Sequence, residues 1–532
     1  MEKRVLIAVN LSIAVMYGYS FLFPPPKQLQ SEKERAIVSL PEAPAVIKSL
    51  PVADQLPPAK IGMPAEDAKD VTVDTDVFKA VFTTQGAALK KLVLKKYKDQ
   101  VGPAGKEIVL TNENNLNQFT LVTEYPGFVE SSGNLFSVNT VNLSLGSTET
   151  KSVDFTLMTP AGVQLVKRFT FTGSGYGIAL DNVLKNRSST AQDGILQTVL
   201  RNRSLKPKDE AGRYEVFGPA TLSESGVVFD SLSDLSKAEK IHSKAVKWTG
   251  FADKYFLTAL TAKDNGISSV SLKDANGILE QRISSAKVSL APGNESTVSY
   301  NLYFGPKDID LLKAQGERLE AVIDLGWFAI IAKPLLHSLK LFYGYLHNYG
   351  LAIIVITVIL KILFFPLTHK SYKSMKQMQK LQPKMQELKD KFKDDRDALN
   401  RSVMELYKTH KVNPLGGCLP MVVQIPVFFG LYKALMFSIE LRHAPFYFWL
   451  QDLSAKDPYY VTPIIMGATM FIQQKMTPTN MDPIQAKMML ALPVVFTVMF
   501  LNFPSGLVLY WLVNNILTIA QQMYINKSLK EA

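Results

Sequence analysis

The sequence predicts a polytopic α-helical membrane protein with six transmembrane helices and a large antiparallel β-sandwich domain outside the membrane. Long apolar runs recur in the second half of the 532-residue chain, and one more lies at its N-terminus. Between them, residues 71–307 consist of short alternating segments separated by turn residues. Basic residues gather beside the apolar runs, which is typical of cytoplasmic membrane loops.

The N-terminal segment 1–23 places Lys3 and Arg4 ahead of an apolar run that is about long enough to cross a bilayer. No small-x-small cleavage site precedes the prolines that follow, so we expect an uncleaved signal anchor. Residues 24–70 are rich in Pro, Ala, Glu and Lys with little periodicity, which predicts a disordered linker.

Alternating segments within 71–307 include VKRFTFT (166–172), GVVFDSL (226–232) and TVSYNLYF (297–304). Clusters of Gly, Asn, Asp and Ser separate them, and this pattern favours a large antiparallel β-sandwich. Residues 308–348 then change to helical spacing and mix Lys and His with aromatic residues. We expect connecting helices there, one of them amphipathic and lying in the outer membrane interface; an ordinary linking helix is the alternative.

Five further apolar runs predict the remaining transmembrane helices, the last four of them within 413–524. Their expected ranges are 349–368, 415–438, 459–474, 488–503 and 505–524.

Loop charges set the expected orientation of these helices. Residues 369–412 carry twelve Lys/Arg against six Asp/Glu, whereas residues 440–458 carry two against three. Short loops rich in Lys and Arg stay in the cytoplasm, so the first loop is expected inside and the second outside. The tail 525–532 carries Lys527 and Lys530, which places both termini in the cytoplasm and the β-domain on the far side.

The basic loop 369–412 is expected to form a helical hairpin, because apolar residues recur in it at spacings of three and four. An apolar seam of this kind packs a hairpin core, but its methionines would also suit an adaptable docking surface. The seam consists of Met375, Met378, Leu381, Met385, Leu388, Phe392, Val403, Leu406 and Tyr407.

Several classes of site are missing from the sequence. It contains no phosphate-binding loop, no dinucleotide glycine fingerprint and no metal-ligand spacing of Cys and His, so we expect neither a cofactor nor an enzyme. Cys418 is the single cysteine, which excludes an internal disulfide. The net charge of +12 lies largely beside apolar runs, which argues against a direct nucleic-acid partner. Five uneven spans also lack the internal repeat usual in secondary transporters.

Lys361 lies inside the apolar run VITVILKILFFPLT, and Thr357 precedes it by one helical turn. A charged side chain at the centre of a bilayer costs at least ~2.5–3.5 kcal/mol. The lysine could reach toward the cytoplasmic interface, or it could face a polar site. Gln424, Asn514 and Asn515 in other spans favour the polar site.

Long segments of the C-terminal part resemble the YidC/Oxa/Alb family of membrane protein insertases, in the Gram-negative form with a large periplasmic domain. The resemblance covers about residues 325–525, and the earlier part matches in layout. It rests on FFPLT (364–368), LQPKMQELK (381–389), KVNPLGGCLPMVVQIPVFFGLYKAL (411–435), LRHAPFYFWLQDLSAKDPYYVTPIIMG (441–467) and FPSGLVLYWLVNN (503–515).

The resemblance implies a core of five helices around a hydrophilic groove that opens to the cytoplasm and to lipid. A positive residue in that groove, usually arginine, falls on Lys361, with Thr357, Gln424 and Asn514 lining the groove. Lysine keeps the charge without the bidentate guanidinium fork. Contacts with the apolar segment of a client protein fall on Phe428, Met466, Met499, Tyr510 and Trp511.

The implied function is insertion and folding of inner-membrane proteins, alone or with the Sec translocon. Implied partners are nascent membrane proteins such as the ATP synthase c subunit, the signal recognition particle receptor, the ribosome and membrane lipid. A different class stays open from the residues alone: a periplasmic β-sandwich that binds a ligand, with the helices as its anchor.

Overall fold

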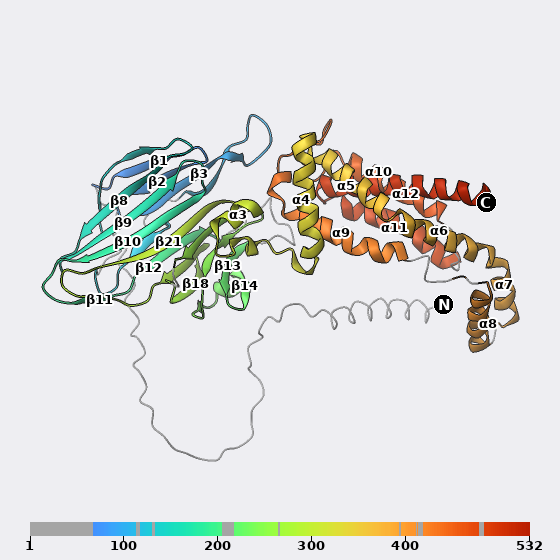
Figure 1. The fold of residues 1–532 in the computed structure, drawn as a ribbon, viewed down its shortest axis with the longest axis horizontal. Coiled ribbons are helices and arrows are strands. Elements are labelled where there is room, and N and C mark those ends of the chain that lie inside the picture. The colour runs from blue at the N-terminus through green and yellow to red at the C-terminus, as the bar shows by residue number, and fades with distance from the viewer. Residues whose placement is uncertain are drawn as a thin grey trace, which may run out of the picture. The chain divides into compact units, whose positions relative to one another are not determined.

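The computed structural model describes residues 67–112, 118–129, 134–204, 217–263, 266–392, 395–410, 412, 419–477 and 483–531. Strands occupy the N-terminal part of this range and helices the C-terminal part (Figure 1). The expected signal anchor, most of the expected linker, and Cys418 lie outside the described residues.

Two large sheets build most of the β-domain in the described residues. The smaller sheet has the order β4 (Glu107–Asn112), β3 (Ala88–Lys98), β2 (Phe78–Thr83), β1 (Asp70–Asp74) and β7 (Asn142–Ser144). The larger has the order β14 (Gly226–Phe229), β13 (Gly218–Ser223), β16 (Trp248–Ala252), β17 (Phe256–Ala262), β21 (Glu295–Pro306), β10 (Gly177–Asn186), β9 (Val163–Thr172), β8 (Thr150–Met158) and β6 (Ser137–Val138).

Aromatic side chains join the inner faces of these two sheets. The ring of Phe82 on β2 lies 4.7 Å from that of Phe169 and 6.3 Å from that of Phe155, between centroids. Phe78 meets Phe171 edge-to-face at 6.4 Å. All of these side chains are fully buried, so the alternating pattern of β9 supplies one face of a sandwich core.

A third sheet is joined to the larger one by side-chain hydrogen bonds to β16 and β17. It has the order β15 (Lys240–His242), β18 (Ser269–Ala275), β19 (Ile278–Ser284), β12 (Gln197–Arg203) and β5 (Val122–Glu124), and the domain also contains the pair β11 (Gln192–Gly194) and β20 (Val288–Leu290) and the short helix α2 (Leu232–Leu235). The buried amide of Gln281 donates to the carbonyl of Gly250 at 2.9 Å, which ties β19 to β16.

The expected antiparallel β-sandwich departs from that pattern in one place. Strand β1 pairs in parallel with β7, whereas the other named strand pairs of the described residues are antiparallel. A parallel pair needs a long crossover connection, and β2 to β6 supply it here. Strand β1 also begins at Asp70, the last residue assigned to the linker.

Lys167 lies on the buried face of β9, between Leu165 and Phe169 in the alternation of that strand. Its ammonium group donates to the carbonyls of Ala87, at 2.9 Å, and of Leu121. Both acceptor residues have positive φ, 46° and 60°, so the lysine stabilises two strained turns at once. Burial lowers the pKa of Lys167 to about 7, because the charged form loses its hydration.

The stability of the β-domain should therefore depend on pH through Lys167. The unfolded lysine keeps its proton up to its ordinary pKa of 10.5, whereas the buried amine loses it near pH 7. Unfolding thus binds a proton between these values, and the free energy of unfolding rises with pH by up to ~1.4 kcal/mol per pH unit. We expect Lys167→Met to remove this part of the slope over pH 7–9, measured by chemical denaturation.

The matched control is Lys273→Met, which replaces an exposed lysine of β18. It should leave the slope of the wild-type protein unchanged. Equal slopes for wild type and Lys167→Met would contradict the assignment of this proton to Lys167.

Three short helices and one longer helix connect the β-domain to the helical region. They are α3 (Ile309–Gln315), η2 (Leu319–Val322), η3 (Gly326–Phe328) and α4 (Ala329–Leu346). Asp308 caps α3 through the backbone N–H groups of Asp310 and Leu311. Lys340 of α4 forms ion pairs with Asp308 at 3.1 Å, with Asp310 at 2.7 Å and with Glu440 at 2.7 Å, which holds α3 against α4.

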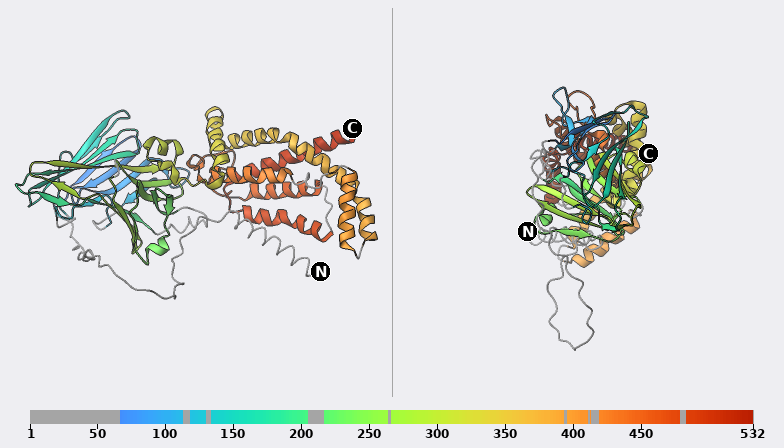
Figure 2. Two further views of the ribbon diagram at one scale, coloured as in Figure 1. Left: turned by 60° about the horizontal axis from the view of Figure 1, so that its bottom comes forward. Right: turned by 90° about the vertical axis from the view of Figure 1, so that its left-hand side faces the viewer.

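The helical region continues with α5 (Tyr349–Leu363), α6 (Phe365–Lys380), α7 (Gln382–Lys391), α8 (Arg396–Thr409), α9 (Leu419–Phe437), η5 (Ile439–Leu441), α10 (Val461–Met476), α11 (Pro483–Phe500) and α12 (Ser505–Glu531). Helix α12 contacts α5, α9 and α10, and α4 packs on α5 and α9. Figures 1 and 2 show α4 lying crosswise to α5 and α12. Gly467 lets α10 approach α11, because a Cβ there would meet the Thr497 hydroxyl at 1.9 Å.

The helix expected over 349–368 is not continuous. Helix α5 ends at Leu363, and Pro366 occupies the first turn of α6, where its missing N–H costs nothing. Among the described residues, no single helix has both the length and the apolar composition of a membrane span, while α5 and α6, bent by 59°, meet these conditions as a pair. The number of transmembrane helices stays a prediction.

The basic segment after α6 folds back on itself through α7 and α8. Leu381 and Met385 are buried, and the hydroxyl of Tyr407 donates to the sulfur of Met385 at 3.0 Å. Met404 is 52% exposed. The apolar seam therefore packs the two helices on each other at Leu381 and Met385.

Candidate functional site

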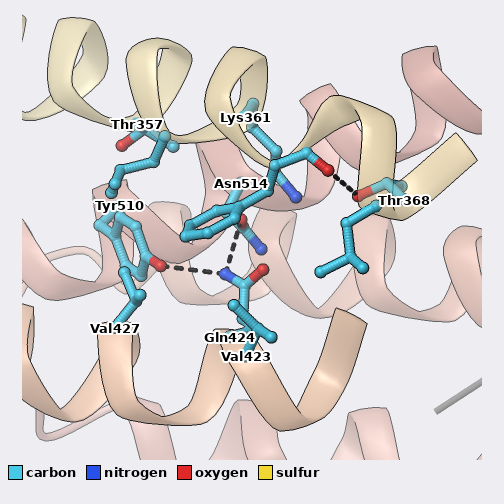
Figure 3. A pocket seen from close by; sticks show the side chains of 11 residues that line it. Thr357, Lys361, Thr368, Val423, Gln424, Val427, Tyr510 and Asn514 are labelled. Carbon is cyan, nitrogen blue, oxygen red and sulfur yellow. Dashed lines mark hydrogen bonds between the residues drawn. The ribbon is translucent and has the colours of Figure 1, made fainter. Parts of the chain in front are cut away.

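A small polar cavity lies where α5, α9 and α12 meet (Figure 3). Its volume is about 20 Å³, which is room for roughly one water molecule. Both apolar and polar side chains line it. They are Thr357, Leu360, Lys361, Phe364, Leu367, Thr368, Val423, Gln424, Val427, Tyr510 and Asn514.

Lys361 reaches this cavity from the last turn of α5. Its ammonium group donates to the Thr518 hydroxyl at 2.7 Å, and its backbone carbonyl accepts from the Gln521 amide at 3.2 Å. No carboxylate in the described part of the chain forms an ion pair with it. The next residues, Ile362 and Leu363, are 68% and 67% exposed. The lysine thus turns inward from an otherwise apolar helix and leaves its positive charge uncompensated.

Gln424 of α9 organises the opposite wall of the cavity. Its amide nitrogen donates to the Tyr510 hydroxyl at 3.1 Å and to the Asn514 side-chain oxygen at 3.0 Å. Figure 3 shows these bonds linking α9 to α12 below Lys361. Thr357 is buried and donates to the carbonyl of Ile353 in its own helix at 2.7 Å. The structure therefore brings together the four predicted groove residues, Lys361, Thr357, Gln424 and Asn514.

The five predicted client contacts occupy different environments. Phe428 and Trp511 meet edge-to-face at 4.7 Å between ring centroids, and both are partly buried. Met499 is 45% exposed on α11. Met466 and Tyr510 are almost fully buried in the helical core, at 0% and 1% exposure. A client could reach these last two only after α9, α10 or α12 had moved.

Sequence reasoning missed Thr518 and Gln521, the two residues of α12 that hold Lys361. The sequence does contain a pattern that marks them, because the polar residues at positions 514, 518 and 521 follow one face of a helix at spacings of four and three. The side-chain oxygens of Gln521 and of its neighbour Gln522 are buried without a hydrogen-bond partner. Polar groups on α12 thus continue beyond Asn514 and are incompletely satisfied.

Removing the acceptor of Lys361 should destabilise the helical region. We expect Thr518→Val to lower the free energy of unfolding by about 1.5–3 kcal/mol, the range for a hydrogen bond to a charged group. Unfolding in mixed detergent micelles measures it. Thr368→Val is the control, because among the described residues that hydroxyl bonds only the carbonyl of Phe364, four positions earlier. Equal losses in the two variants would contradict a specific role of Thr518.

Two family models match the two regions. One, described as the 60Kd inner membrane protein, matches residues 341–532, and the other, described as the YidC periplasmic domain, matches residues 70–338.

Relatives match along their whole length. The membrane protein insertase YidC of Geotalea daltonii is 57% identical over 530 residues, which is 99% of this chain and 100% of the relative. That of Citrifermentans bemidjiense is 58% identical over 538 residues, 100% of both chains. A crystal structure of an active YidC insertase with its first transmembrane domain resolved aligns at 20% identity with a TM-score of 0.37, over 87% of this chain and 93% of that one.

The family models cover the strand-rich and the helical regions, and the identity of the relatives extends through both. These findings confirm the resemblance drawn from the apolar segments. The chain belongs to the YidC family of membrane protein insertases, with a periplasmic β-rich domain and a C-terminal helical region.

Proposed function

We propose that this chain inserts and folds inner-membrane proteins, and that hydrophilic segments of a client are received at the cavity around Lys361. The function follows from family membership. The observation that supports the site is Lys361 itself: a cation among apolar helices, held by the Thr518 hydroxyl. Charge attraction is stronger there than in bulk water, so an acidic client tail would gain a cationic partner that forms no ion pair within the described residues.

Groove and client contacts have different roles in this proposal. Thr357, Gln424 and Asn514 supply polar surface beside Lys361, while apolar client segments meet Phe428, Trp511 and Met499. Because the cavity holds roughly one water molecule, a client must separate α5 from α9 to enter. The hydrogen bonds of Gln424 to α12 would break and be replaced by bonds to the client, which also brings Met466 and Tyr510 within reach.

The proposed arrangement has six transmembrane helices, with both termini in the cytoplasm and the β-domain in the periplasm. The crosswise helix α4 then lies along the outer membrane surface. Helix α10 has 16 residues and covers roughly 24 Å at ~1.5 Å per residue, against ~30 Å of hydrocarbon. Short spans thin the surrounding bilayer, which lowers the barrier for a polar segment near Lys361.

Proposed partners follow from the same arrangement. Nascent inner-membrane proteins are the clients, with the ATP synthase c subunit as an example. The Sec translocon would meet the helical region, and the signal recognition particle receptor and ribosome would meet the basic hairpin. Relatives are named as insertases, so no chemical reaction is assigned to the chain.

The charge of Lys361 should matter more than its hydrogen-bond geometry. We expect Lys361→Arg to retain insertion, Lys361→Ala to reduce it about tenfold for clients with acidic translocated tails, and Lys361→Glu to reduce it further by repulsion. A tenfold effect corresponds to ~1.4 kcal/mol. An insertion assay with paired clients that differ only in tail charge measures this.

Clients with neutral tails serve as the internal control and should lose less than threefold, about half of that energy on the same scale. Equal losses for acidic and neutral tails would assign Lys361 to holding α5 on α12 instead of receiving substrate.

The basic hairpin should be required for insertion. Deleting residues 375–408 removes α7, the C-terminal end of α6 and nearly all of α8, together with positive charges that attract the membrane surface at ~1 kcal/mol each. We expect insertion in reconstituted vesicles to fall to background.

Deletion of residues 71–300 is the control, because it removes the β-domain and keeps the helical region. Insertion should survive it. If insertion required the β-domain and tolerated loss of the hairpin, the helices would act as an anchor for a periplasmic binding protein.

A further inference from the structure

A second cavity lies in the connecting segment, between η2, η3 and α4. Its volume is about 230 Å³, which equals roughly seven or eight water molecules. Four charged side chains line it: Arg318, Glu320, Asp324 and Lys333. Two positive and two negative groups thus face one space that is far larger than the cavity at Lys361.

These four charged side chains form no ion pairs with one another in the described part of the chain. In the described part of the chain, Arg318, Glu320 and Lys333 form neither an ion pair nor a side-chain hydrogen bond. Asp324 uses one carboxylate oxygen to accept the backbone N–H of Gly326 at 2.8 Å. Lys340, two turns further along α4, shows the contrast because it pairs with three carboxylates. The cavity therefore holds separated cations and anions that are available to a ligand.

The strained backbone at the edge of the cavity indicates that this connecting segment does more than join the β-domain to the helical region. Gly316, Glu317 and Arg318 have φ values of 79°, 49° and 57° in succession. Residues other than glycine adopt the left-handed region rarely, and such conformations cluster at ligand sites. This turn directs the chain so that Arg318 lines the cavity while Leu319 enters the core.

Large apolar side chains flank the same cavity. Trp327 and Ile330 are 75% and 83% exposed, and each directly follows a residue that lines the cavity, Gly326 and Ala329. Aromatic and aliphatic side chains beside basic residues are typical of a membrane interface. The charged cavity thus opens next to a surface suited to acyl chains.

We propose that this cavity binds the headgroup of a zwitterionic phospholipid with a primary amine, phosphatidylethanolamine, in the outer leaflet. Arg318 and Lys333 hold the phosphate, which suits their positive charge. Glu320 and the second carboxylate oxygen of Asp324 accept hydrogen bonds from the ammonium group. Trp327 and Ile330 contact the acyl chains. The bound lipid fixes α4 at the membrane surface, a role separate from receiving clients at Lys361.

Lipid retention by the purified full-length chain tests the proposal. The chain in detergent is mixed with phosphatidylethanolamine, phosphatidylcholine or phosphatidylglycerol, and retained lipids are counted by native mass spectrometry. We expect at least fivefold more phosphatidylethanolamine than phosphatidylcholine, because a quaternary ammonium has no N–H to donate. The double variant Arg318→Gln and Lys333→Gln should lose this binding.

Two further variants separate lipid recognition from misfolding. Glu320→Gln should abolish the preference for phosphatidylethanolamine over phosphatidylcholine while retaining phosphatidylglycerol at the wild-type level or above. The controls Lys313→Gln and Glu317→Gln change exposed charges outside the cavity and should leave all three lipids unchanged. Equal retention of the two zwitterionic lipids by the wild-type chain, or a preference that survives Glu320→Gln, would overturn the proposal.

Discussion

Placing one cation among apolar helices is the constraint on which the arrangement of the helical region depends. Lys361 cannot face lipid without a cost of at least ~2.5–3.5 kcal/mol, so α5 must turn that face toward polar groups. Helix α12 supplies them through Thr518 and Gln521, and α9 adds Gln424 on the other side. Because α12 also contacts α10, the position of one lysine is linked to the packing of much of the helical core.

The charge of Lys361 is held in the cavity by a hydrogen bond, but no group of opposite charge in the described residues neutralises it. Thr518 accepts a hydrogen bond from Lys361 but carries no negative charge, and the polar network of Gln424, Tyr510 and Asn514 is neutral as well. A carboxylate in place of Thr518 would stabilise the resting protein and compete with an acidic client. The observed set of neutral partners keeps the helices together, and under the proposed function the unpaired charge would attract an acidic client segment.

The β-domain also contains a buried lysine, but it accommodates the side chain in a different way. Lys167 is as deeply buried as any apolar core residue, yet it donates to two backbone carbonyls whose residues have positive φ. A neutral amine retains two N–H groups, enough for both acceptors. Here burial lowers the pKa of Lys167, and the side chain connects β9 to two turns through its hydrogen bonds. Lysine thus serves rigidity in the β-domain, whereas in the helical region its charge has no ion-pair partner among the described residues.

The division into strand-rich and helical regions could be predicted from the amino-acid sequence, because alternation and long apolar runs are local patterns. It also identified Lys361, Thr357, Gln424 and Asn514 as polar residues inside apolar segments. Which of these residues meet depends on the fold, since contacts between α5, α9 and α12 join residues over 60 positions apart.

Other features depend on packing between distant segments and could not be predicted from the local pattern of apolar and polar residues. The parallel pairing of β1 with β7 and the partner of Lys361 on α12 required the fold, because neither is set by nearby residues. The same holds for Lys167, which occupies a buried position of an alternating strand although its charge would favour the surface. Local sequence sets which face of an element is buried, whereas the groups that satisfy a buried charge come from distant parts of the chain.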